Sequence, residues 1–280
     1  MVKNAIRAVV PHSVRNSLRS PWRSAAWLWD SAAFSLGRTK AIELAPGWNL
    51  VCHPHFYKVV HSAQLADSEQ SEEFRNFFAR CSEKMFLFDI GAHFGVFSLA
   101  AAHRGGRAVA VDPSPTAIDM ITVETKLNRC ADRVHTLQAA VSDATGDMSL
   151  LSSGPFSEGY FKVVRGRMER DLTKTHAVTL DQMASEFGTP THIKIDVEGH
   201  EASVLEGARK LLAEKLPFLF LELHNDMISE EGGDPAEALN ILDSLGYRIR
   251  GLDGDAMTRN AILRLPIVRV TAERDDSRAS

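Results

Sequence analysis

Short apolar segments alternate with longer amphipathic ones along the middle of the chain. The short segments are apolar at almost every position, which is typical of strands covered on both faces, whereas the longer ones carry apolar residues three and four positions apart, as helices do. The predicted strands are residues 85–90, 107–111, 134–141, 192–197 and 217–223, and the predicted helices are residues 96–104, 116–128, 179–187, 202–212 and 234–245. This alternation predicts an α/β fold with a mostly parallel sheet and helices on both of its faces.

The segments on either side of this alternation have weaker patterns. Residues 45–60 predict one or two short strands that form a hairpin, and residues 68–82 predict a helix capped by Ser71. Residues 247–252 and 261–270 predict a terminal antiparallel pair, which completes seven strands. The predicted organisation is a helical extension (1–44), short strands with a lead-in helix (45–84), a main domain (85–270) with a polar, variable excursion (152–176), and a disordered tail (271–280).

Composition narrows the class of protein. The chain has 280 residues, of which 44% are hydrophobic and 24% charged, as in ordinary globular proteins, and its net charge of −4 provides no general attraction for nucleic acid. Its three cysteines are far apart and odd in number, which argues against a disulfide framework or a zinc site. They fit a reducing compartment, so we expect a cytoplasmic protein.

The N-terminal segment has its own charge pattern. Residues 1–40 contain seven basic residues and one acidic residue, Asp30, with Trp22, Trp27, Trp29 and Phe34 among them. One interpretation is peripheral contact with an anionic membrane surface. The other, which we favour, is a helix that packs its aromatic residues on the domain. We expect neither a signal peptide, because the apolar stretch starts late and contains Asp30, nor a membrane span, because the apolar runs are too short.

The segment Asp89-Ile90-Gly91-Ala92-His93-Phe94-Gly95 carries the first candidate chemistry. A buried strand runs here into a glycine turn and then a helix, a geometry that brings backbone N–H groups and a helix N-terminus to a ligand. Asp112, at the end of the next strand, is placed to accept hydrogen bonds from ribose hydroxyls. Together these features predict an adenosine-containing cofactor.

The spacing of the turn distinguishes between cofactors. A dinucleotide fingerprint would need glycine where His93 stands, and a P-loop would need Lys-Ser or Lys-Thr where Val96-Phe97 follow. The form D-x-G-x-x-x-G instead resembles motif I of class I S-adenosylmethionine-dependent methyltransferases, in which the acid can face the cationic methionine end. The alternative is a purely structural Asp89 at a strand-to-helix turn.

A second group of ionisable residues follows two later strands. Asp196, Glu198, His200 and Glu201 follow one strand, and Glu222 and His224 lie at the end of the next, where open α/β sheets bind ligands. Three interpretations stay open. Asp196, Glu198, His200 or His224 is a general base; Asp196, Glu198 or Glu222 binds a divalent metal with a histidine; or these groups satisfy one another and cap the next helix.

Four stretches in continuous order resemble the FkbM-type methyltransferases, a subgroup of the Rossmann-like S-adenosylmethionine-dependent enzymes. The resemblance covers about residues 85–250 and excludes 1–45, 152–176 and the tail. Its most distinctive part is K-I-D-V-E-G-H-E followed by V-L-x-G-A. The stretches are FDIGAHFGVFSL (88–99), AVDPSP (110–115) with KLN (126–128), VTLDQM (178–183), and IKIDVEGHEASVLEGA (193–208) with FLELH (220–224).

The resemblance implies a role for each matching residue. Asp196 would sit by the transferable methyl group, with Glu198 and His200 near the acceptor. The family commonly has Glu-Pro where this chain has Asp112-Pro113, and Asn where it has His93. The implied cofactor site consists of a methionine and ribose cradle (Asp89, Gly91, Ala92, His93, Gly95), a ribose ligand (Asp112) and residues that border the adenine (Pro113, Ser114, Ala139, Ala140).

The resemblance also implies the reaction: transfer of a methyl group from S-adenosylmethionine to a hydroxyl of a sugar, glycan or other secondary metabolite. The sequence leaves a divalent metal open without indicating one. The main alternative is a catalytically silent Rossmann-like binding or scaffold protein. An oxidoreductase is disfavoured by the missing third glycine. Nucleic-acid methylation is disfavoured by the acidic net charge and by the absence of an N-P-P-Y type of loop.

Overall fold

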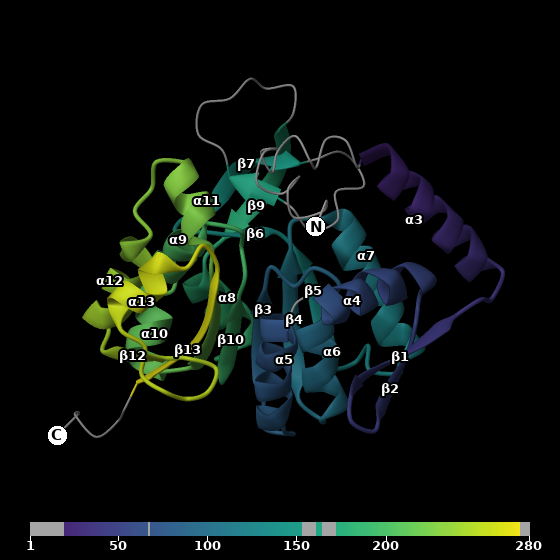
Figure 1. The fold of residues 1–280 in the computed structure, drawn as a ribbon, viewed down its shortest axis with the longest axis horizontal. Helices are drawn as coiled ribbons and strands as arrows, with labels where there is room; N and C mark the ends of the chain where they lie inside the picture. The colour runs from purple at the N-terminus through teal and green to yellow at the C-terminus, as the bar shows by residue number, and fades with distance from the viewer. Residues whose placement is uncertain (1–19, 67, 153–160, 164–171, 275–280) are drawn as a thin grey trace, which may run out of the picture.

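A twisted seven-stranded sheet forms the centre of the molecule in a computed structural model that describes residues 20–66, 68–152, 161–163 and 172–274 (Figure 1). Its strand order is β12-β13-β11-β10-β3-β4-β5, and every strand but β13 runs in the same direction. The predicted Rossmann-like α/β fold with an antiparallel terminal strand is confirmed. The strands are β3 (Phe86–Ile90), β4 (Arg107–Asp112), β5 (Val134–Gln138), β10 (His192–Ile195), β11 (Phe218–Leu223), β12 (Tyr247–Arg250) and β13 (Val268–Arg274).

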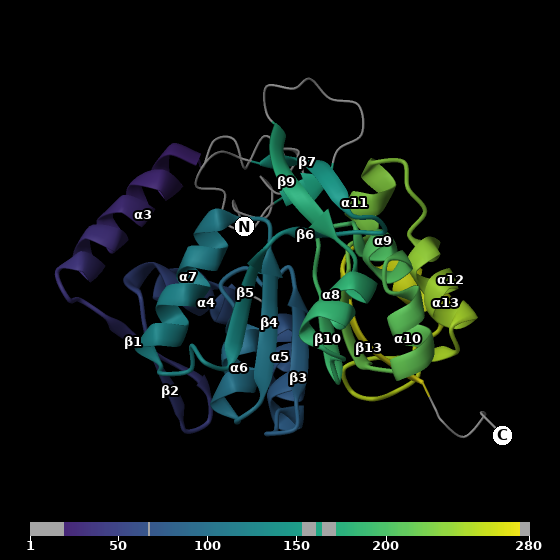
Figure 2. The same ribbon diagram turned by 180° about the vertical axis from the view of Figure 1, so that it is seen from behind.

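Helices cover both faces of this sheet, as Figures 1 and 2 show from opposite sides. Both faces need this cover because the strands are apolar on both sides. In β3, for example, Leu87 packs into the core on one face, and Phe86, Phe88 and Ile90 pack into the core on the other. The first face carries α4 (Pro54–Ala66), α5 (Ser68–Arg80), α6 (Val96–His103) and α7 (Pro115–Leu127), and the second carries α8 (Leu180–Phe187), α9 (Glu201–Glu206), α10 (Arg209–Lys215) and α12 (Ala236–Ser244).

The three cysteines are buried free thiols: Cys52, Cys81 and Cys130.

The segment before the main domain differs in part from its prediction. The hairpin exists, but its strands are β1 (Lys40–Ala45) and β2 (Trp48–Cys52), and residues 54–60 belong to helix α4. Proline is tolerated in the first turn of a helix, and Phe56 and Val60, one helical turn apart, are buried. Ser71 lies inside α5, which begins at Ser68, so the prediction that it caps this helix is wrong.

A second, four-stranded sheet was not predicted. Its order is β6-β9-β7-β8, with β6 (Ala140–Val141), β7 (Gly146–Ser152), β8 (Phe161–Val163) and β9 (Leu172–Val178). The pattern of residues 148–151 does predict a strand, which falls within the observed β7. The predicted strand 134–141 divides at Ala139, because β6 leaves the main sheet and pairs in parallel with β9. Residues 172–176, predicted as part of a polar excursion, are strand; the buried core beneath them is small, so their apolar pattern is weak. The rest of the excursion, 153–160 and 164–171, lies outside the described residues.

The C-terminal region also differs from its prediction. Residues 259–264 form helix α13 (Arg259–Arg264), capped by Thr258, and the strand begins only at Val268. Strand β13 extends to Arg274, so residues 271–274 belong to the sheet and not to the tail. Helix α11 (Asn225–Glu230) was not predicted. The predicted helix 202–212 divides at Gly207, where an added Cβ would lie 2.1 Å from the carbonyl oxygen of Ser142.

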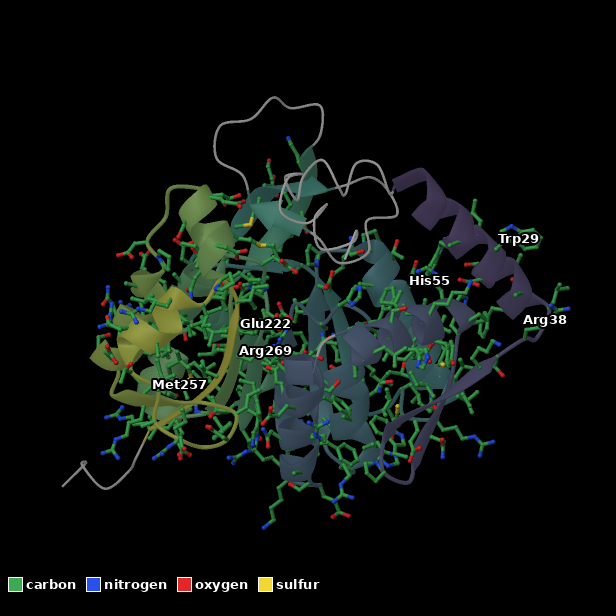
Figure 3. The ribbon with its side chains drawn as sticks, in the orientation of Figure 1. Trp29, Arg38, His55, Glu222, Met257 and Arg269 are labelled. Carbon is green, nitrogen blue, oxygen red and sulfur yellow. The ribbon has the colours of Figure 1, made fainter. Side chains whose placement is uncertain are left out.

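The N-terminal extension contains helix α3 (Ser20–Ser35), and residues 1–19 lie outside the described part. Trp27 stacks on His53 with 5.7 Å between ring centroids, and Phe34 packs on the same ring, as the packing interpretation predicts. The buried Asp30 lies 3.1 Å from His55 and 2.6 Å from Lys58. Trp29 points away from the domain and is 76% exposed (Figure 3). Among the described residues, none of the helices has the length and apolar character needed to cross a membrane.

Candidate active site

The candidate site lies at the carboxyl ends of the parallel strands. Strand pairing sets Ile195 level with Ile90 and Leu221, and Ile90 level with Val111. The next residue on each strand therefore belongs to one row, which consists of Gly91, Asp112, Asp196 and Glu222. The sheet thus brings both groups of predicted residues to one edge, called the rim below.

The glycine loop connects β3 to α6 and is held against β4. The N–H groups of Gly91 and Ala92 donate to the carbonyl oxygen of Val111 at 2.9 and 3.0 Å. Gly91 has a φ of +75°, and a Cβ added there would lie 1.8 Å from the carbonyl oxygen of Asp196. Gly95, also at φ +75°, precedes α6 and would place a Cβ 2.8 Å from the side chain of Ile121. Both glycines are therefore required by close packing as well as by backbone conformation.

Asp112 ends β4 beneath this loop and is 3% exposed. Its carboxylate accepts hydrogen bonds from the N–H groups of His93 at 2.9 Å and Ser114 at 2.8 Å. Burial raises the pKa of Asp112 to about 7, although these two hydrogen bonds oppose the shift. Each carboxylate oxygen keeps a further lone pair, so this residue can still accept from ligand hydroxyls.

Asp89 forms hydrogen bonds inside the protein, although its position in the motif predicts contact with a cofactor. Its Oδ2 accepts hydrogen bonds from the N–H group of Ser98 at 3.0 Å and from the hydroxyl of the same residue at 2.6 Å. Burial raises the pKa of Asp89 to about 6 against these hydrogen bonds. Asp89 thus ties the loop to the first turns of α6, which agrees with the structural alternative.

The residues predicted to border an adenine ring lie together beyond β4 and β5. Asp112 pairs in register with Gln138, so Pro113 and Ser114 lie beyond one strand while Ala139 and Ala140 lie beyond its neighbour. Ser114 also begins α7, where its hydroxyl accepts the N–H of Ala117 at 3.2 Å. Ala139 and Ala140 are buried.

The second predicted group forms a compact cluster at β10 and β11. The Nε2 atom of His224 lies 3.9 Å from Oδ1 of Asp196 and 3.7 Å from Oε2 of Glu198. The turn after β10 makes this arrangement: Glu198 and Gly199 have φ values of +54° and +99°, and the turn returns the Glu198 side chain toward Asp196. We call Asp196, Glu198 and His224 the acidic cluster.

His224 is oriented from behind by Glu201, which is fully buried. The Nδ1 atom of His224 lies 2.9 Å from Oε1 of Glu201, and the same oxygen accepts the N–H of Gly199. Burial would lower the pKa of His224, but the hydrogen bond to Glu201 and the negative charges of Asp196 and Glu198 outweigh it and raise the pKa to about 9. Burial raises the pKa of Glu198 to about 7, against the opposing charge of His224.

A buried charge network supports the cluster from the sheet side. Lys194 is 2% exposed, and its Nζ lies 3.1 Å from Glu73 and 3.8 Å from both Asp196 and Glu222. Arg269 holds Glu222 through two bonds of 3.0 and 2.7 Å, and Figure 3 shows this pair at the centre of the molecule. Burial would lower the pKa of Lys194, but the carboxylates of Glu73, Asp196 and Glu222 raise it.

His200 bonds to a residue outside the acidic cluster. Its Nε2 is 2.9 Å from the hydroxyl of Ser142, a residue that follows β6. The structure therefore brings together Asp196, Glu198 and His224 of the predicted catalytic residues, and directs His200 to another partner.

Sequence reasoning missed Lys194, Glu73 and Arg269 as parts of this site. Two of them carry a recognisable signal. Lys194 lies within a strand covered on both faces, two residues before Asp196, and Glu73 lies one helical turn before the buried Phe77 on α5. Arg269 has no such signal, because the position of β13 between β11 and β12 was not predictable from its pattern.

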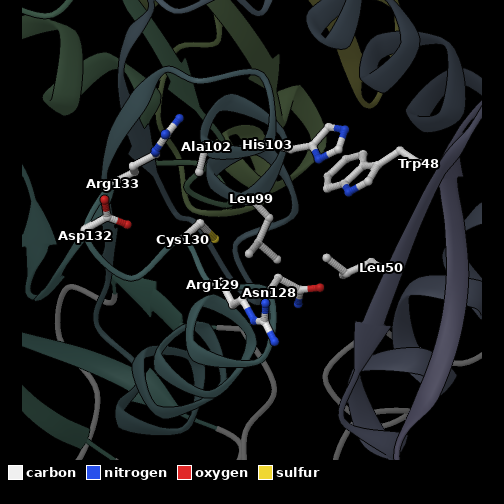
Figure 4. A pocket seen from close by; sticks show the side chains of 10 residues that line it. All are labelled: Trp48, Leu50, Leu99, Ala102, His103, Asn128, Arg129, Cys130, Asp132 and Arg133. Atoms are coloured by element: carbon white, nitrogen blue, oxygen red, sulfur yellow. The ribbon is translucent and has the colours of Figure 1, made fainter.

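A separate pocket of about 260 Å³ opens between β2, α6 and the end of α7 (Figure 4). None of the predicted site residues lines it. Its walls are Trp48, Leu50, Leu99, Ala102, His103, Asn128, Arg129, Cys130, Asp132 and Arg133.

Comparison with known proteins identifies related sequences. A family model described as the methyltransferase FkbM domain matches residues 89–249, more than half of the chain. The hexuronic acid methyltransferase AglP of Haloferax volcanii is 27% identical over 158 residues, which is 56% of this chain and 60% of that protein. The chain thus aligns with less than two thirds of this relative.

Two solved methyltransferase structures match this chain at low sequence identity. A methyltransferase FkbM from Methylobacillus flagellatus has 14% identity and a TM-score of 0.45, over 77% of this chain and 59% of that one. An O-methyltransferase from Bacillus cereus, solved with S-adenosylhomocysteine, has 12% identity and a TM-score of 0.43, over 79% of this chain and 89% of that one.

Proposed function

We propose that this chain, which belongs to the FkbM methyltransferase family, transfers a methyl group from S-adenosylmethionine to a hydroxyl of a sugar or glycan. The observation that carries the proposal is the contact between the two halves of the rim. Gly91 of the glycine loop packs against the carbonyl oxygen of Asp196, and the N–H of Asp196 donates to Ile90 at 3.0 Å. Residues suited to a nucleoside and residues suited to a hydroxyl are thus neighbours.

The loop fits an adenosine-containing group by its own chemistry. Gly91 and Gly95 allow the loop to turn tightly against Asp196 and Ile121, and Asp112 offers a buried carboxylate for ribose hydroxyls. Ala92, His93 and Gly95 would surround the methionine and ribose parts, while Pro113, Ser114, Ala139 and Ala140 would border the adenine. Asp89 would hold the loop on α6. When bound, S-adenosylmethionine supplies an electrophilic methyl group, which becomes a methyl ether on the acceptor.

Glu198 is the best candidate for the general base. Its pKa, raised to about 7 by burial, is close to the value at which a base is most effective at neutral pH. Its side chain is 22% exposed, so an acceptor can reach it. With no metal ion bound, His224 is protonated at this pH because its pKa is about 9, so it cannot take the proton of the acceptor.

The acceptor class is suggested by the related sequence. The relative from Haloferax volcanii is described as a hexuronic acid methyltransferase, which acts on a sugar acid. We therefore propose a carbohydrate as the acceptor, and the methylated group is proposed to be a hydroxyl because the family resemblance implies it.

The first test is calorimetric titration of the protein with S-adenosylhomocysteine and, separately, with NADH. We expect binding of the first compound only, and at least a tenfold loss of affinity in Asp112→Asn, about the value of one charge-assisted hydrogen bond. Asp119→Asn, on the exposed face of α7, is the matched control and should bind as the wild type does.

The outcomes separate the alternatives. Binding of NADH alone would favour an oxidoreductase, and binding of neither compound would favour a scaffold protein. If Asp112→Asn bound S-adenosylhomocysteine with unchanged affinity, the proposed ribose site would be wrong. A screen of hexuronic acid glycans and other sugars, followed by mass spectrometry of the products, then tests the acceptor class; methylated nucleic acid in place of methylated sugar would overturn it.

A further inference from the structure

The imidazole of His224 has an unusual environment on its outer side. The side chain is 3% exposed, yet its Nε2 lies 3.9, 3.7 and 3.8 Å from oxygens of Asp196, Glu198 and Glu222. A hydrogen bond from an imidazole nitrogen to a carboxylate would be about 2.7–2.9 Å long. Three carboxylates therefore surround this nitrogen at a distance too long for hydrogen bonds.

The distances between these atoms are close to those between the ligand atoms of one metal ion. Donor atoms that lie about 2.0–2.3 Å from one ion are separated from each other by about 3–3.8 Å. One donor atom from each of Asp196, Glu198 and His224 lies within 4.8 Å of the others. Small side-chain rotations would close the cluster around an ion. Glu222 is less available, because Arg269 already binds both of its oxygens.

Glu201 holds His224 in the orientation that a metal ligand needs. Glu201 is fully buried and bonds to Nδ1, which fixes the ring with Nε2 directed into the acidic cluster. Histidines that bind metals usually donate their other ring nitrogen to a carboxylate in this way, because the interaction fixes the tautomer and strengthens the ligand.

The local charge also favours a cation. Five carboxylates lie in or around the cluster, and their ion-pair partners include two permanently charged cations, Lys194 and Arg269. The carboxylates are those of Glu73, Asp196, Glu198, Glu201 and Glu222. Asp196 and Glu198 are 30% and 22% exposed, which gives an ion a route from solvent.

We propose that Asp196, Glu198 and His224 bind one divalent metal ion, oriented through Glu201, and that this ion positions the acceptor hydroxyl. Two carboxylates and one imidazole suit ions such as Mn²⁺ better than Ca²⁺, which prefers six to eight oxygen ligands. Positions not taken by the three side chains are open to the acceptor.

The second half of this proposal rests on the proposed methyltransferase function. An ion-bound hydroxyl loses its proton more easily, and the free oxygen of Glu198 passes that proton to solvent. The acceptor oxygen then forms its bond to the methyl carbon as the sulfur–carbon bond breaks, and the sulfur keeps the electron pair. The positive charge of the sulfonium is thereby neutralised, so charge and atoms balance.

The test is the binding of Mn²⁺ to the EDTA-treated 280-residue chain, measured from the electron paramagnetic resonance signal of the ion that stays free in solution. We expect one Mn²⁺ per chain, and at least a tenfold loss of affinity in Asp196→Asn and in Glu198→Gln. Glu201→Gln should weaken binding by about 10–100-fold, as is usual for residues that orient a ligand. Glu230→Gln, an exposed acid on α11, is the matched control and should leave the affinity unchanged.

Two results would overturn the metal site. The first is that the wild type binds no Mn²⁺ at 1 mM. The second is that Asp196→Asn and Glu198→Gln both keep the wild-type affinity for Mn²⁺. Asp196→Asn removes a charge that faces the buried Lys194 at 3.8 Å, whereas Glu198→Gln changes a partner of His224, and circular dichroism checks that each variant folds. Binding of S-adenosylhomocysteine is measured on the same samples. A protein that binds it but no Mn²⁺ retains the proposed function without the metal, and the reverse result rejects the function alone.

Discussion

Gly91 is the residue at which the cofactor loop and the acidic cluster touch. Its φ of +75° and the 1.8 Å that would separate an added Cβ from the carbonyl oxygen of Asp196 are two separate reasons for glycine. Gly47, in the β1–β2 turn, has nearly the same φ, +78°, but nothing within 4 Å of an added Cβ. The two positions therefore separate backbone strain from steric overlap.

We predict that Gly47→Ala lowers the free energy of unfolding by about 1–2 kcal/mol, the cost of a left-handed alanine. Gly91→Ala should cost several kcal/mol more, because backbone must move away from backbone, and should abolish binding of S-adenosylhomocysteine. Urea unfolding and calorimetry measure both effects. Equal losses of stability in the two variants would show that the contact with Asp196 is unimportant.

His224 makes stability depend on pH. Its pKa of about 9 in the folded state exceeds the usual 6.5, so the folded protein binds the extra proton more tightly than the unfolded chain. The resulting stabilisation is complete below about pH 6.5 and disappears as the pH rises through 9. Asp196, Glu198, Glu201 and Glu222 provide the negative charge responsible.

We predict that, in EDTA, the unfolding free energy contributed by this group falls by about 3 kcal/mol between pH 6.5 and 9, the value of a shift of this size. His224→Asn should flatten the decline, whereas His176→Asn, an exposed histidine on β9, should not. Chemical unfolding at a series of pH values gives the slopes. Parallel slopes for the wild type and His224→Asn would contradict the prediction.

At the scale of elements, helix α5 is joined to the rim through one buried ion pair. Glu73 on α5 is 1% exposed and lies 3.1 Å from Lys194 of β10. Removing one charge from such a pair leaves the other buried without compensation. Burial raises the pKa of Glu73, which Lys194 opposes.

We predict that Lys194→Met lowers the free energy of unfolding by about 3–5 kcal/mol, as is usual when one partner of a buried pair is lost. The double variant Lys194→Met/Glu73→Leu should recover part of this loss, since it also removes the stranded carboxylate. Urea unfolding of the wild type, Lys194→Met, Glu73→Leu and the double variant forms a double-mutant cycle. A change below about 0.5 kcal/mol in Lys194→Met would reject the coupling of α5 to the rim.

Helix α3 has two unlike faces. Trp27, Asp30 and Phe34 pack toward the domain, whereas Trp29 on the helix is 76% exposed and Leu36, the first residue after the helix, is 78% exposed. Residues 1–40 carry seven basic side chains and one acidic side chain, and this acid is paired with Lys58. Exposed apolar side chains within a segment of basic sequence suit an anionic lipid surface.

We predict that the protein binds vesicles containing phosphatidylglycerol more strongly than pure phosphatidylcholine vesicles. The double variant Trp29→Ser/Leu36→Ser should weaken binding at least tenfold, because each buried side chain contributes roughly 1.5–3 kcal/mol. Leu265→Ser, an exposed apolar residue next to α13, is the control. Co-sedimentation gives the affinities; identical retention of all three proteins would contradict a role for α3.

At the scale of the whole molecule, the parallel sheet explains why distant segments share one site. Its strand order places β10 beside β3, so the loop after residue 90 and the cluster after residue 195 become neighbours although about a hundred residues separate them. The motif residues could be predicted because buried strands and glycine turns have strong local patterns. The edge they share follows from parallel pairing alone.

Other features depended on contacts that the local pattern does not contain. Asp89 matches a cofactor motif, yet its carboxylate bonds to Ser98; His200 matches a catalytic motif, yet it bonds to Ser142. The small sheet of β6–β9 has too small a buried core to impose a clear alternation, and β13 takes its place between β11 and β12 only in the folded chain.

The sequence by itself determined the class of fold, the glycine loop and the set of acids and histidines at the strand ends, because hydrophobic periodicity and turn residues act over short distances. Only the tertiary structure decided which of those groups meet. It directed Nε2 of His224 between three carboxylates, brought Lys194, Glu73 and Arg269 beneath them, and bonded His200 to Ser142. These contacts join residues far apart in the chain, so they arise from packing and long-range charge.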